Sequence, residues 1–274
     1  MEFRILGSFE VVGSAGVLDL RGAKRRGLLA CLVVHAGQPM STDRLVEELW
    51  GDAGSDGAAR TVQTYVSQLR KMLHGEPASL GTTPGGYMLE VDLGDVDACR
   101  FEQEVSAASA QPDAAQRLAM IDEALVLSRG PPLGEFAGAG WADREARRLE
   151  ALHLQAQQCR YGALMELGRA REAVAELEVL VSAHPLDEML WAQLMLALYR
   201  SGRQADALGA YQQARSHLVD ELGIEPGPEL AELEHRILEH DPTLVATTSR
   251  SASAGTQRDS AGSPAGNWYP RTLL

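Results

Sequence analysis

Several features that mark common protein classes are missing from this 274-residue sequence. The longest apolar run, Leu28 to Val34, is far shorter than the roughly 20 residues that a membrane-spanning helix needs. The three cysteines, Cys31, Cys99 and Cys159, lie far apart and are odd in number, which supports neither a disulfide framework nor a CxxC metal site. The opening MEFRILGSFEVV lacks the charged and apolar regions of a secretion signal. We therefore expect a cytoplasmic protein, associated with the nucleoid if it binds DNA, with no membrane segment.

Signatures of catalysis are absent as well. The sequence contains no GxxxxGK[ST] phosphate loop, no GxSxG nucleophile turn and no HExxH zinc motif, and its seven histidines are scattered. We therefore expect no enzyme activity, no cofactor and no bound metal.

Positive charge is scarce and unevenly distributed. The formal net charge is −13, and only two lysines are present, Lys24 and Lys71. Residues 1–92 carry 9 basic and 11 acidic side chains, residues 93–241 carry 13 and 26, and residues 242–274 carry 3 and 1. The acidity therefore lies in the second part of the chain. A near-neutral first part can still bind nucleic acid where its cations cluster.

The most informative stretch is a helix predicted from Ala58 to Leu73, because its two faces differ. Apolar residues recur at the spacing of one helix side, which predicts a buried face: Val62, Val66, Leu69 and Leu73, with Tyr65 and Met72 beside them. The other side carries residues that can hold phosphates and hydrogen-bond base edges: Arg60, Gln63, Thr64, Ser67, Arg70 and Lys71. An ordinary surface helix with a solvated polar face has the same pattern, so the context must separate the two interpretations.

The flanking elements favour DNA binding. Residues 2–20 alternate as three short antiparallel strands, and helices are predicted from Ala23 to Ala36 and, after an N-cap at Ser41, from Thr42 to Trp50. A β-hairpin follows the Ala58–Leu73 helix, with strands Leu80 to Thr83 and Tyr87 to Val91. Helices followed by a hairpin give the order of a winged helix, in which the last helix enters the major groove.

This arrangement assigns roles to particular residues. We expect Arg60, Gln63, Thr64 and Ser67 to face the groove, and Arg70 and Lys71 to hold the DNA backbone. The wing is expected to touch DNA through Thr82, Thr83 and the backbone at Gly85 and Gly86, where missing side chains permit close approach. Tyr87 either reaches a phosphate or packs in its strand. Lys24 and Arg25 either approach a phosphate or form a solvated helix start.

The second part of the chain shows an internal repeat. Gly168-Arg169 recurs as Gly202-Arg203, and Ala173 recurs as Ala207, each 34 positions later, which is the tetratricopeptide period. Further helices are predicted at 114–128, 141–166 and 228–240. After Pro242 the composition becomes rich in serine, glycine and alanine, which predicts a disordered tail over residues 242–274.

Three segments carry a resemblance to a known family. The run RGAKRRGLLACLVVHAGQPMSTDRLVEELWGD, followed by AARTVQTYVSQLRKML and TPGGYML, resembles the OmpR-type winged helix of the Streptomyces antibiotic regulatory protein family. PLGEF near Leu133, the helix ADREARRLEALHLQA and, most specifically, VDELGIEPGPELAELEHRIL from Val219 resemble that family's bacterial transcriptional activation domain. The resemblance covers about residues 1–241.

The resemblance implies a mainly α fold with a small β component. An N-terminal winged helix-turn-helix (1–92) precedes an all-α tetratricopeptide-like domain (93–241). It also implies an activator, one that controls a secondary-metabolite (antibiotic) gene cluster, that binds promoter direct repeats as a side-by-side homodimer and recruits RNA polymerase holoenzyme. The Gly51–Gly57 loop, with Asp52 and Asp56, matches the loop by which OmpR-type activators meet polymerase, although a solubilising loop has the same composition. A tetratricopeptide scaffold that binds protein rather than DNA remains the alternative. No receiver domain precedes the winged helix, which argues against a response regulator.

Overall fold

The computed structural model describes residues 1–51 and 57–245, which form two lobes: an N-terminal lobe (residues 1–92) and a C-terminal lobe (residues 93–245). The chain begins with a three-stranded antiparallel sheet in the order β1 (Glu2–Arg4), β2 (Glu10–Gly13) and β3 (Gly16–Val17). Phe3 and Val11 are paired across β1 and β2, and both are fully buried. The predicted three-stranded platform is therefore present.

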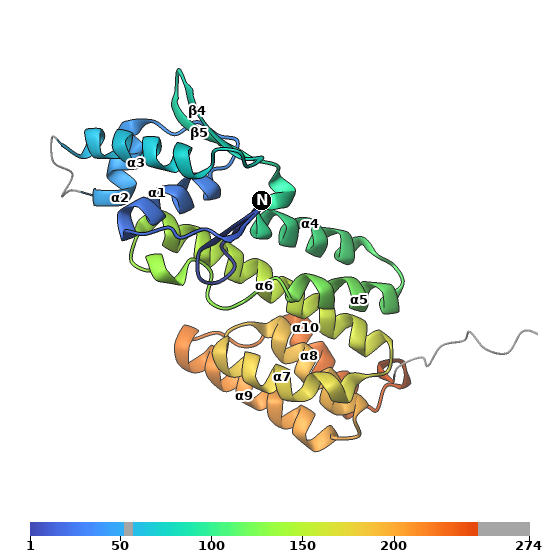
Figure 1. Ribbon diagram of the computed structural model, residues 1–274. Coiled ribbons are helices and arrows are strands. Elements are labelled where there is room, and N and C mark those ends of the chain that lie inside the picture. Colours follow the sequence, from blue (N-terminus) through green and yellow to red (C-terminus); the bar gives the residue numbers. More distant parts are fainter. Residues whose placement is uncertain (52–56, 246–274) are drawn as a thin grey trace, which may run out of the picture.

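Three helices and a hairpin complete the N-terminal lobe, as predicted. The helices are α1 (Ala23–Val34), α2 (Thr42–Trp50) and α3 (Ala58–Met72), and the hairpin consists of β4 (Ser79–Thr83) and β5 (Gly86–Glu90). Ser41 caps α2 by accepting a hydrogen bond from the Arg44 amide at 3.1 Å. In Figure 1 the hairpin projects from the lobe beside α3.

The segment before α2 lies against the hairpin. The amides of Met40 and Tyr87 each donate to the other residue's carbonyl oxygen, at 2.8 and 2.9 Å, and the Gly37 amide donates to the Leu89 carbonyl at 2.9 Å. The hairpin is thereby fixed to the loop between α1 and α2. This pairing joins residues far apart in the sequence and was not predicted.

The C-terminal lobe is entirely helical within the described residues. It contains α4 (Asp97–Ala110), α5 (Ala114–Leu125), α6 (Gly140–Glu166), α7 (Ala170–Ala183), α8 (Glu188–Arg200), α9 (Gln204–Leu222) and α10 (Pro228–Leu238), with short 3-10 turns η2 (Leu93–Asp95), η3 (Gly134–Phe136) and η4 (Pro242–Leu244). α4 was not predicted from the sequence. None of the described helices combines the length and the apolar content required to cross a membrane.

The 34-residue period reappears in the helix positions. α7 and α9 each begin two residues after the repeated glycine, and Gly168 and Gly202 both have positive φ, 71° and 81°. Ala173 and Ala207 are both fully buried at equivalent places in these helices. The starts of α7 and α9 therefore follow the 34-residue spacing of the repeat.

The predicted start of the disordered segment, at residue 242, is wrong. Residues 242–245, assigned to a disordered segment, are ordered in the structure: Leu244 in η4 is buried, and its carbonyl accepts a hydrogen bond from Arg200 Nε at 2.8 Å. Asp241 starts this turn by accepting from the Thr243 amide at 2.8 Å. The buried leucine and the cap explain why the chain stays folded past Pro242. Residues 246–274 lie outside the described residues.

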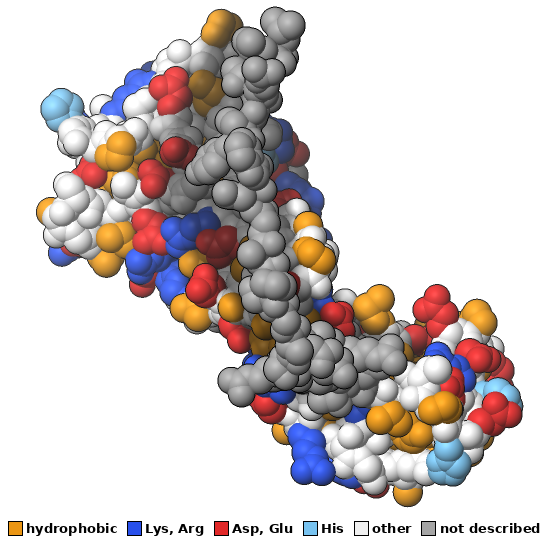
Figure 2. Space-filling view, turned by 90° about the vertical axis from the view of Figure 1, so that its right-hand side faces the viewer, with side chains coloured by type: hydrophobic (Ala, Val, Ile, Leu, Met, Phe, Trp, Pro, Cys, Tyr) orange, Lys and Arg blue, Asp and Glu red, His pale blue; other side chains and the backbone are white. Residues whose placement is uncertain are grey.

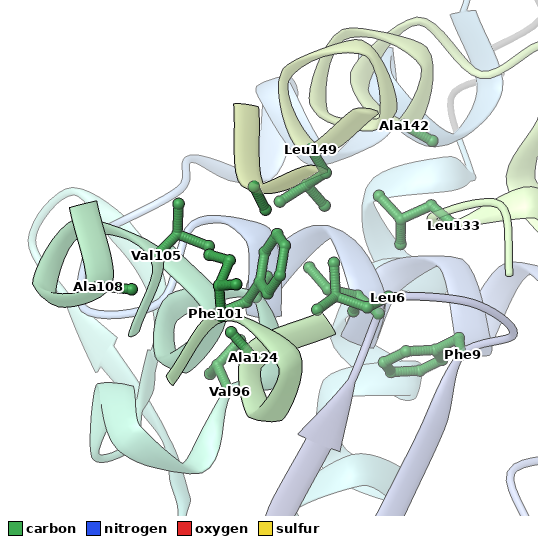
Figure 3. Close-up of a cluster of buried hydrophobic side chains, with 14 of the residues drawn as sticks. Leu6, Phe9, Val96, Phe101, Val105, Ala108, Ala124, Leu133, Ala142 and Leu149 are labelled. Carbon is green, nitrogen blue, oxygen red and sulfur yellow. The ribbon is translucent and has the colours of Figure 1, made fainter. Parts of the chain in front are cut away.

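A shared hydrophobic cluster joins the two lobes. In Figure 3, Leu6 of the N-terminal lobe lies beside Phe101 on α4, with Leu149 of α6 above them and Phe9 on the other side of Leu6. The two lobes therefore have a continuous core. Figure 2 shows acidic and basic side chains interspersed on the visible part of one face. Cutting the chain after Asp92 would expose the apolar side of the first sheet.

A buried carboxylate reinforces this junction. Asp97, at the start of α4, is 2% exposed and accepts hydrogen bonds from the amides of Ile5 at 2.8 Å and Leu6 at 3.1 Å. Arg129 donates to the same carboxylate at 3.3 Å, and its own amide donates to the Leu6 carbonyl at 2.8 Å. Burial raises the pKa of Asp97, while these hydrogen bonds act in the opposite direction. Asp97 thus binds the end of β1 to α4.

Candidate nucleic-acid interface

The structure confirms the two faces of α3. Val62, Val66 and Leu69 are buried against α1 and α2, and Tyr65 and Met72 are half-buried at the edge of the core. The predicted polar residues all lie on the exposed side: Arg60, Gln63, Thr64, Ser67, Arg70 and Lys71. The hydrophobic period therefore predicted which side chains this helix leaves in solvent.

Four of these side chains make no hydrogen bond within the described residues. They are Arg60, Gln63, Ser67 and Lys71, and they follow one another along the exposed side of α3. The Thr64 hydroxyl donates to the Arg60 carbonyl at 3.0 Å, which leaves its oxygen free to accept a hydrogen bond. Free donors and acceptors on an exposed helix can exchange water for phosphate or base edges.

Arg70 is tied to the hairpin instead. Its Nε donates to the Leu80 carbonyl at 2.7 Å, and its Nη2 donates to the Thr82 hydroxyl at 2.6 Å. The guanidinium also lies 5.9 Å from the centre of the Tyr87 ring. The structure therefore brings three predicted DNA-contact residues together, and the contacts within the protein position the wing relative to α3.

The structural requirement for glycine at positions 85 and 86 of the wing differs from the expected one. Gly86 has φ +129°, and a Cβ placed there would lie only 1.9 Å from the Met40 carbonyl oxygen. A Cβ on Gly85 would lie 3.3 Å from Pro39 Cβ. The expectation that the missing Gly86 side chain leaves room for DNA is therefore wrong in its reason, because that space faces the protein's own backbone.

The remaining wing residues are partly engaged. Thr83 donates from its hydroxyl to the Gly86 carbonyl at 3.2 Å, whereas Thr82 is exposed at the edge of β4. Tyr87 is half-buried and packs against the core, as one of its two alternatives predicted. Thr82 is the more accessible of the two threonines.

The basic residues in the first turn of α1 form hydrogen bonds to α2 and α3. Lys24 donates from Nζ to the Leu49 carbonyl at the end of α2, where a cation is favourable, and lies 5.5 Å from the centre of the Trp50 ring. Arg25 donates to Gln68 Oε1 on α3 at 3.0 Å. Both contacts position the helices of the lobe.

One exposed residue of α3 was not predicted as a contact. Gln68 is exposed on α3 beside the predicted contacts and was missed, although it follows Ser67 directly on the polar side. Asp52 and Asp56, predicted to meet polymerase, lie outside the described residues.

Among the residues that the structure describes, no three His, Cys, Asp or Glu side chains are grouped so that they could hold a metal ion.

Comparison with known proteins covers both lobes. Residues 20–89 match the family model "Transcriptional regulatory protein, C terminal", and residues 96–238 match "Bacterial transcriptional activator domain". Regulatory protein DnrI of Streptomyces peucetius is 36% identical over 81% of this chain and 86% of its own length. This chain belongs to the Streptomyces antibiotic regulatory protein family. Members of this family are transcriptional activators, and the winged helix and the helical lobe of this chain each match one of the two domain models.

Other relatives extend beyond this chain. Regulatory protein AfsR of Streptomyces griseus is 37% identical over 89% of this chain, which spans only 25% of that protein. The solved structure "Mycobacterium tuberculosis EmbR in complex with low affinity phosphopeptide" superposes with a TM-score of 0.82 at 35% identity, covering 87% of this chain and 65% of that one. The two-lobed arrangement is therefore shared with an experimentally determined structure of a family relative.

Proposed function

We propose that this chain binds double-stranded promoter DNA with α3 in the major groove and the β4–β5 hairpin on the neighbouring backbone. The row of exposed, unengaged side chains on α3 supports this proposal most directly. Arg60, Gln63 and Ser67 can reach base edges, and Thr64 can accept from an exposed amino group. Lys71 lies at the end of α3, where it can pair with a phosphate.

Within this proposal, Arg70 and the wing act together. The Arg70 hydrogen bonds to Leu80 and Thr82 hold the hairpin at a fixed angle to α3. A hairpin in this position meets the DNA backbone when α3 occupies the groove. Thr82 and the turn around Gly85 then supply the phosphate contacts, and Lys24 and Arg25 act by positioning α2 and α3.

The proposed biological role is activation of a secondary-metabolite gene cluster in the cytoplasm, without enzyme activity. Two copies bind direct repeats side by side, and the C-terminal lobe together with Asp52 and Asp56 contacts RNA polymerase holoenzyme. Family membership supports this role, and the surplus of acidic residues in 93–241 suits a protein partner rather than DNA.

Base recognition is tested with Gln63→Ala. The preferred DNA site is first selected from a random pool with the full chain, and affinity is then measured by fluorescence anisotropy on that site and on a scrambled one. Loss of a base contact should weaken selected-site binding about tenfold and scrambled-site binding little. Gln155→Ala, an exposed glutamine on α6, is the matched control. Equal losses on both DNAs would contradict base recognition by α3.

The polymerase contact is tested by in vitro transcription. Asp52→Ala combined with Asp56→Ala should occupy the promoter normally but yield less transcript. Unchanged transcript would assign this loop to solubility alone. A protein that binds no DNA at any salt concentration would favour the alternative scaffold function, since phosphate contacts make affinity strongly salt-dependent.

A further inference from the structure

A groove of about 410 Å³ runs between α7 and α9 in the C-terminal lobe. These helices lie at the end of the molecule that is farthest from the hairpin (Figure 1). Trp191, Leu194 and Leu198 of α8 form its floor, and the His217 ring stacks on Trp191 with 6.1 Å between ring centres. The α9 side extends from Arg203 to His217, about 21 Å along the helix. The groove is therefore long enough for a short peptide segment.

A glycine leaves open space on the α9 side of this groove. Gly209 lies inside the helix and has no positive φ, and a Cβ added to it would meet no described atom within 4 Å outside its own stretch of helix. Glycine inside a helix destabilises that helix relative to alanine. Neither backbone geometry nor packing within the described lobe compensates for this cost. The space above Gly209 can hold a flat side chain that lies directly on α9.

The rim of the groove is polar and carries an uncompensated negative charge. Arg203 faces two carboxylates, Glu178 at 3.8 Å and Asp206 at 2.7 Å, so one cation is shared between two anions. Gln213 is exposed on the same rim and makes no hydrogen bond with any described residue. An occupant with aromatic rings, a hydrogen-bonding group and a cation would therefore match both floor and rim.

The segment that follows the described residues contains these groups. Residues 246–274 carry Trp268 and Tyr269 side by side, with Arg271 two positions later. The segment has three arginines and one aspartate, whereas residues 93–241 have 13 basic and 26 acidic side chains. Opposite charge favours association of the segment with the C-terminal lobe.

The segment also starts close to one end of the groove. The Leu244 carbonyl accepts from Arg200 Nε at 2.8 Å, and Arg200 ends α8 three residues before Arg203. Trp268 lies 23 positions after Val245, and a chain of that length spans up to about 75 Å. The aromatic pair can therefore reach the whole groove. Attachment to the same molecule raises its effective concentration there to about the millimolar range.

We propose that the segment around Trp268 and Tyr269 docks in the α7–α9 groove of its own chain, with the Trp268 indole over Gly209. The Tyr269 hydroxyl pairs with Gln213, and Arg271 meets the rim carboxylates. The docked segment closes the groove, so a protein partner that binds there must first displace it. This inference does not rest on the proposed DNA contacts.

The test uses the full chain labelled with 5-fluorotryptophan, whose four tryptophans give four fluorine NMR signals. Trp268→Ala identifies the Trp268 signal, and a peptide of residues 262–274 gives the position of the undocked indole. In the unaltered chain the Trp268 signal should lie away from the peptide position. Because Trp191 forms the groove floor, its signal should move in Trp268→Ala, whereas those of Trp50 and Trp141 should not.

Docking is blocked from the groove side with Gly209→Leu, which fills the space on α9 and raises the helix propensity, so folding is maintained. The docking equilibrium constant should fall at least about tenfold, and the Trp268 signal should move to the peptide position. Ala175→Leu is the matched control and should leave the signal unchanged. Ala175 is the exposed residue of α7 at the equivalent repeat position, 34 residues earlier, and lies outside the groove.

Two results would overturn the docking site: a Trp268 signal at the peptide position in the unaltered chain, or a shifted signal that Gly209→Leu leaves in place. Dilution separates docking within one chain from docking into a second copy. A signal that stays constant on dilution supports the intramolecular arrangement. A signal that moves toward the peptide position on dilution would overturn it.

Discussion

Arg60 and Lys71 on α3 have surroundings opposite to those of Arg148 and Arg160 on α6. On α3, Arg60 and Lys71 form no ion pair within the described residues. On α6, Arg148 lies between Glu145 and Glu102, at 2.8 and 2.9 Å, and Arg160 between Asp122 and Glu176, at 2.6 and 2.8 Å. These pairs raise the pKa of Arg148 further, against the effect of partial burial.

This difference resolves the apparent conflict between a net charge of −13 and DNA binding. Cations that already face carboxylates gain little from a phosphate, because the existing pair must first be broken. Cations that face only water displace the counterions condensed on DNA. The release of those counterions then contributes fully to the free energy of binding. The local arrangement of charge therefore decides where DNA can bind, and the net charge of the chain does not.

The largest expected effect comes from Asp97→Ala, which removes the carboxylate that joins the N-terminal lobe to α4. Removal of the carboxylate leaves the buried amides of Ile5 and Leu6 without their acceptor, while Arg129 keeps its pair with Glu10. The free energy of unfolding should therefore fall by about 3 kcal/mol. Urea denaturation measures this change. Asp206→Ala, which removes an exposed pair with Arg203, should cost under about 0.5 kcal/mol. Similar losses for the two variants would show that Asp97 does not hold the junction.

Gly86→Ala should damage the DNA-binding lobe almost as strongly. Because the added Cβ would overlap the Met40 carbonyl, the wing must shift, at a cost of about 2–3 kcal/mol. Affinity for the selected DNA site should fall with it. Gly85→Ala, whose added Cβ would lie 3.3 Å from Pro39 Cβ, is the control for the free energy of unfolding only. Comparable losses of stability at both positions would contradict the close packing of Gly86.

Paired and unpaired cations are compared directly with Lys71→Ala and Arg148→Ala. The first should reduce DNA affinity on all sequences and lower the dependence of log K on log salt by about 0.9, the value for one phosphate. The second should leave DNA affinity unchanged and reduce the free energy of unfolding by up to about 1 kcal/mol. Salt titrations of binding and urea denaturation provide the two measurements. A reduced salt dependence of DNA binding in Arg148→Ala would show that a cation already paired with carboxylates also contacts phosphate.

The smallest expected effect concerns Arg70→Lys, which keeps the charge but loses the two-directional hydrogen bonding to Leu80 and Thr82. The wing should become more mobile relative to α3, with a loss of about 0.5–1 kcal/mol in binding to the selected site. Amide hydrogen exchange of β4 should rise at the same time. Unchanged exchange would mean that the β4–β5 pairing alone fixes the hairpin.

The sequence was sufficient for local elements and insufficient for contacts between distant ones. The faces of α3 follow from a period of 3.6 residues, and the cap at Ser41 follows from its position before α2. α4 was missed because its buried side combines Phe101 and Val105 with alanines, which give a weak hydrophobic signal. Family resemblance supplied the two-part organisation more reliably than composition did.

Site contacts could be predicted only as far as they are local. The exposed row on α3 is set by the helix itself, so it was predictable. The Arg70 hydrogen bonds to β4 and the approach of Gly86 to Met40 depend on how the hairpin packs. For the same reason, nothing in the sequence showed that Lys24 would reach the end of α2.

The length of α6 sets the distance between α2 in the N-terminal lobe and α8 in the C-terminal lobe. Near its start, Arg144 pairs with Glu48 of α2 at 2.7 Å, and near its end the Met165 carbonyl accepts from Arg200 of α8 at 2.9 Å. Its 27 residues make a rod of about 40 Å, visible in Figure 1 running from one lobe to the other. One inserted residue would turn the distal repeats by about 100° relative to α3, and four would nearly restore their phase. With α3 in the groove as proposed, the length of α6 would fix which side of the duplex the repeat lobe faces.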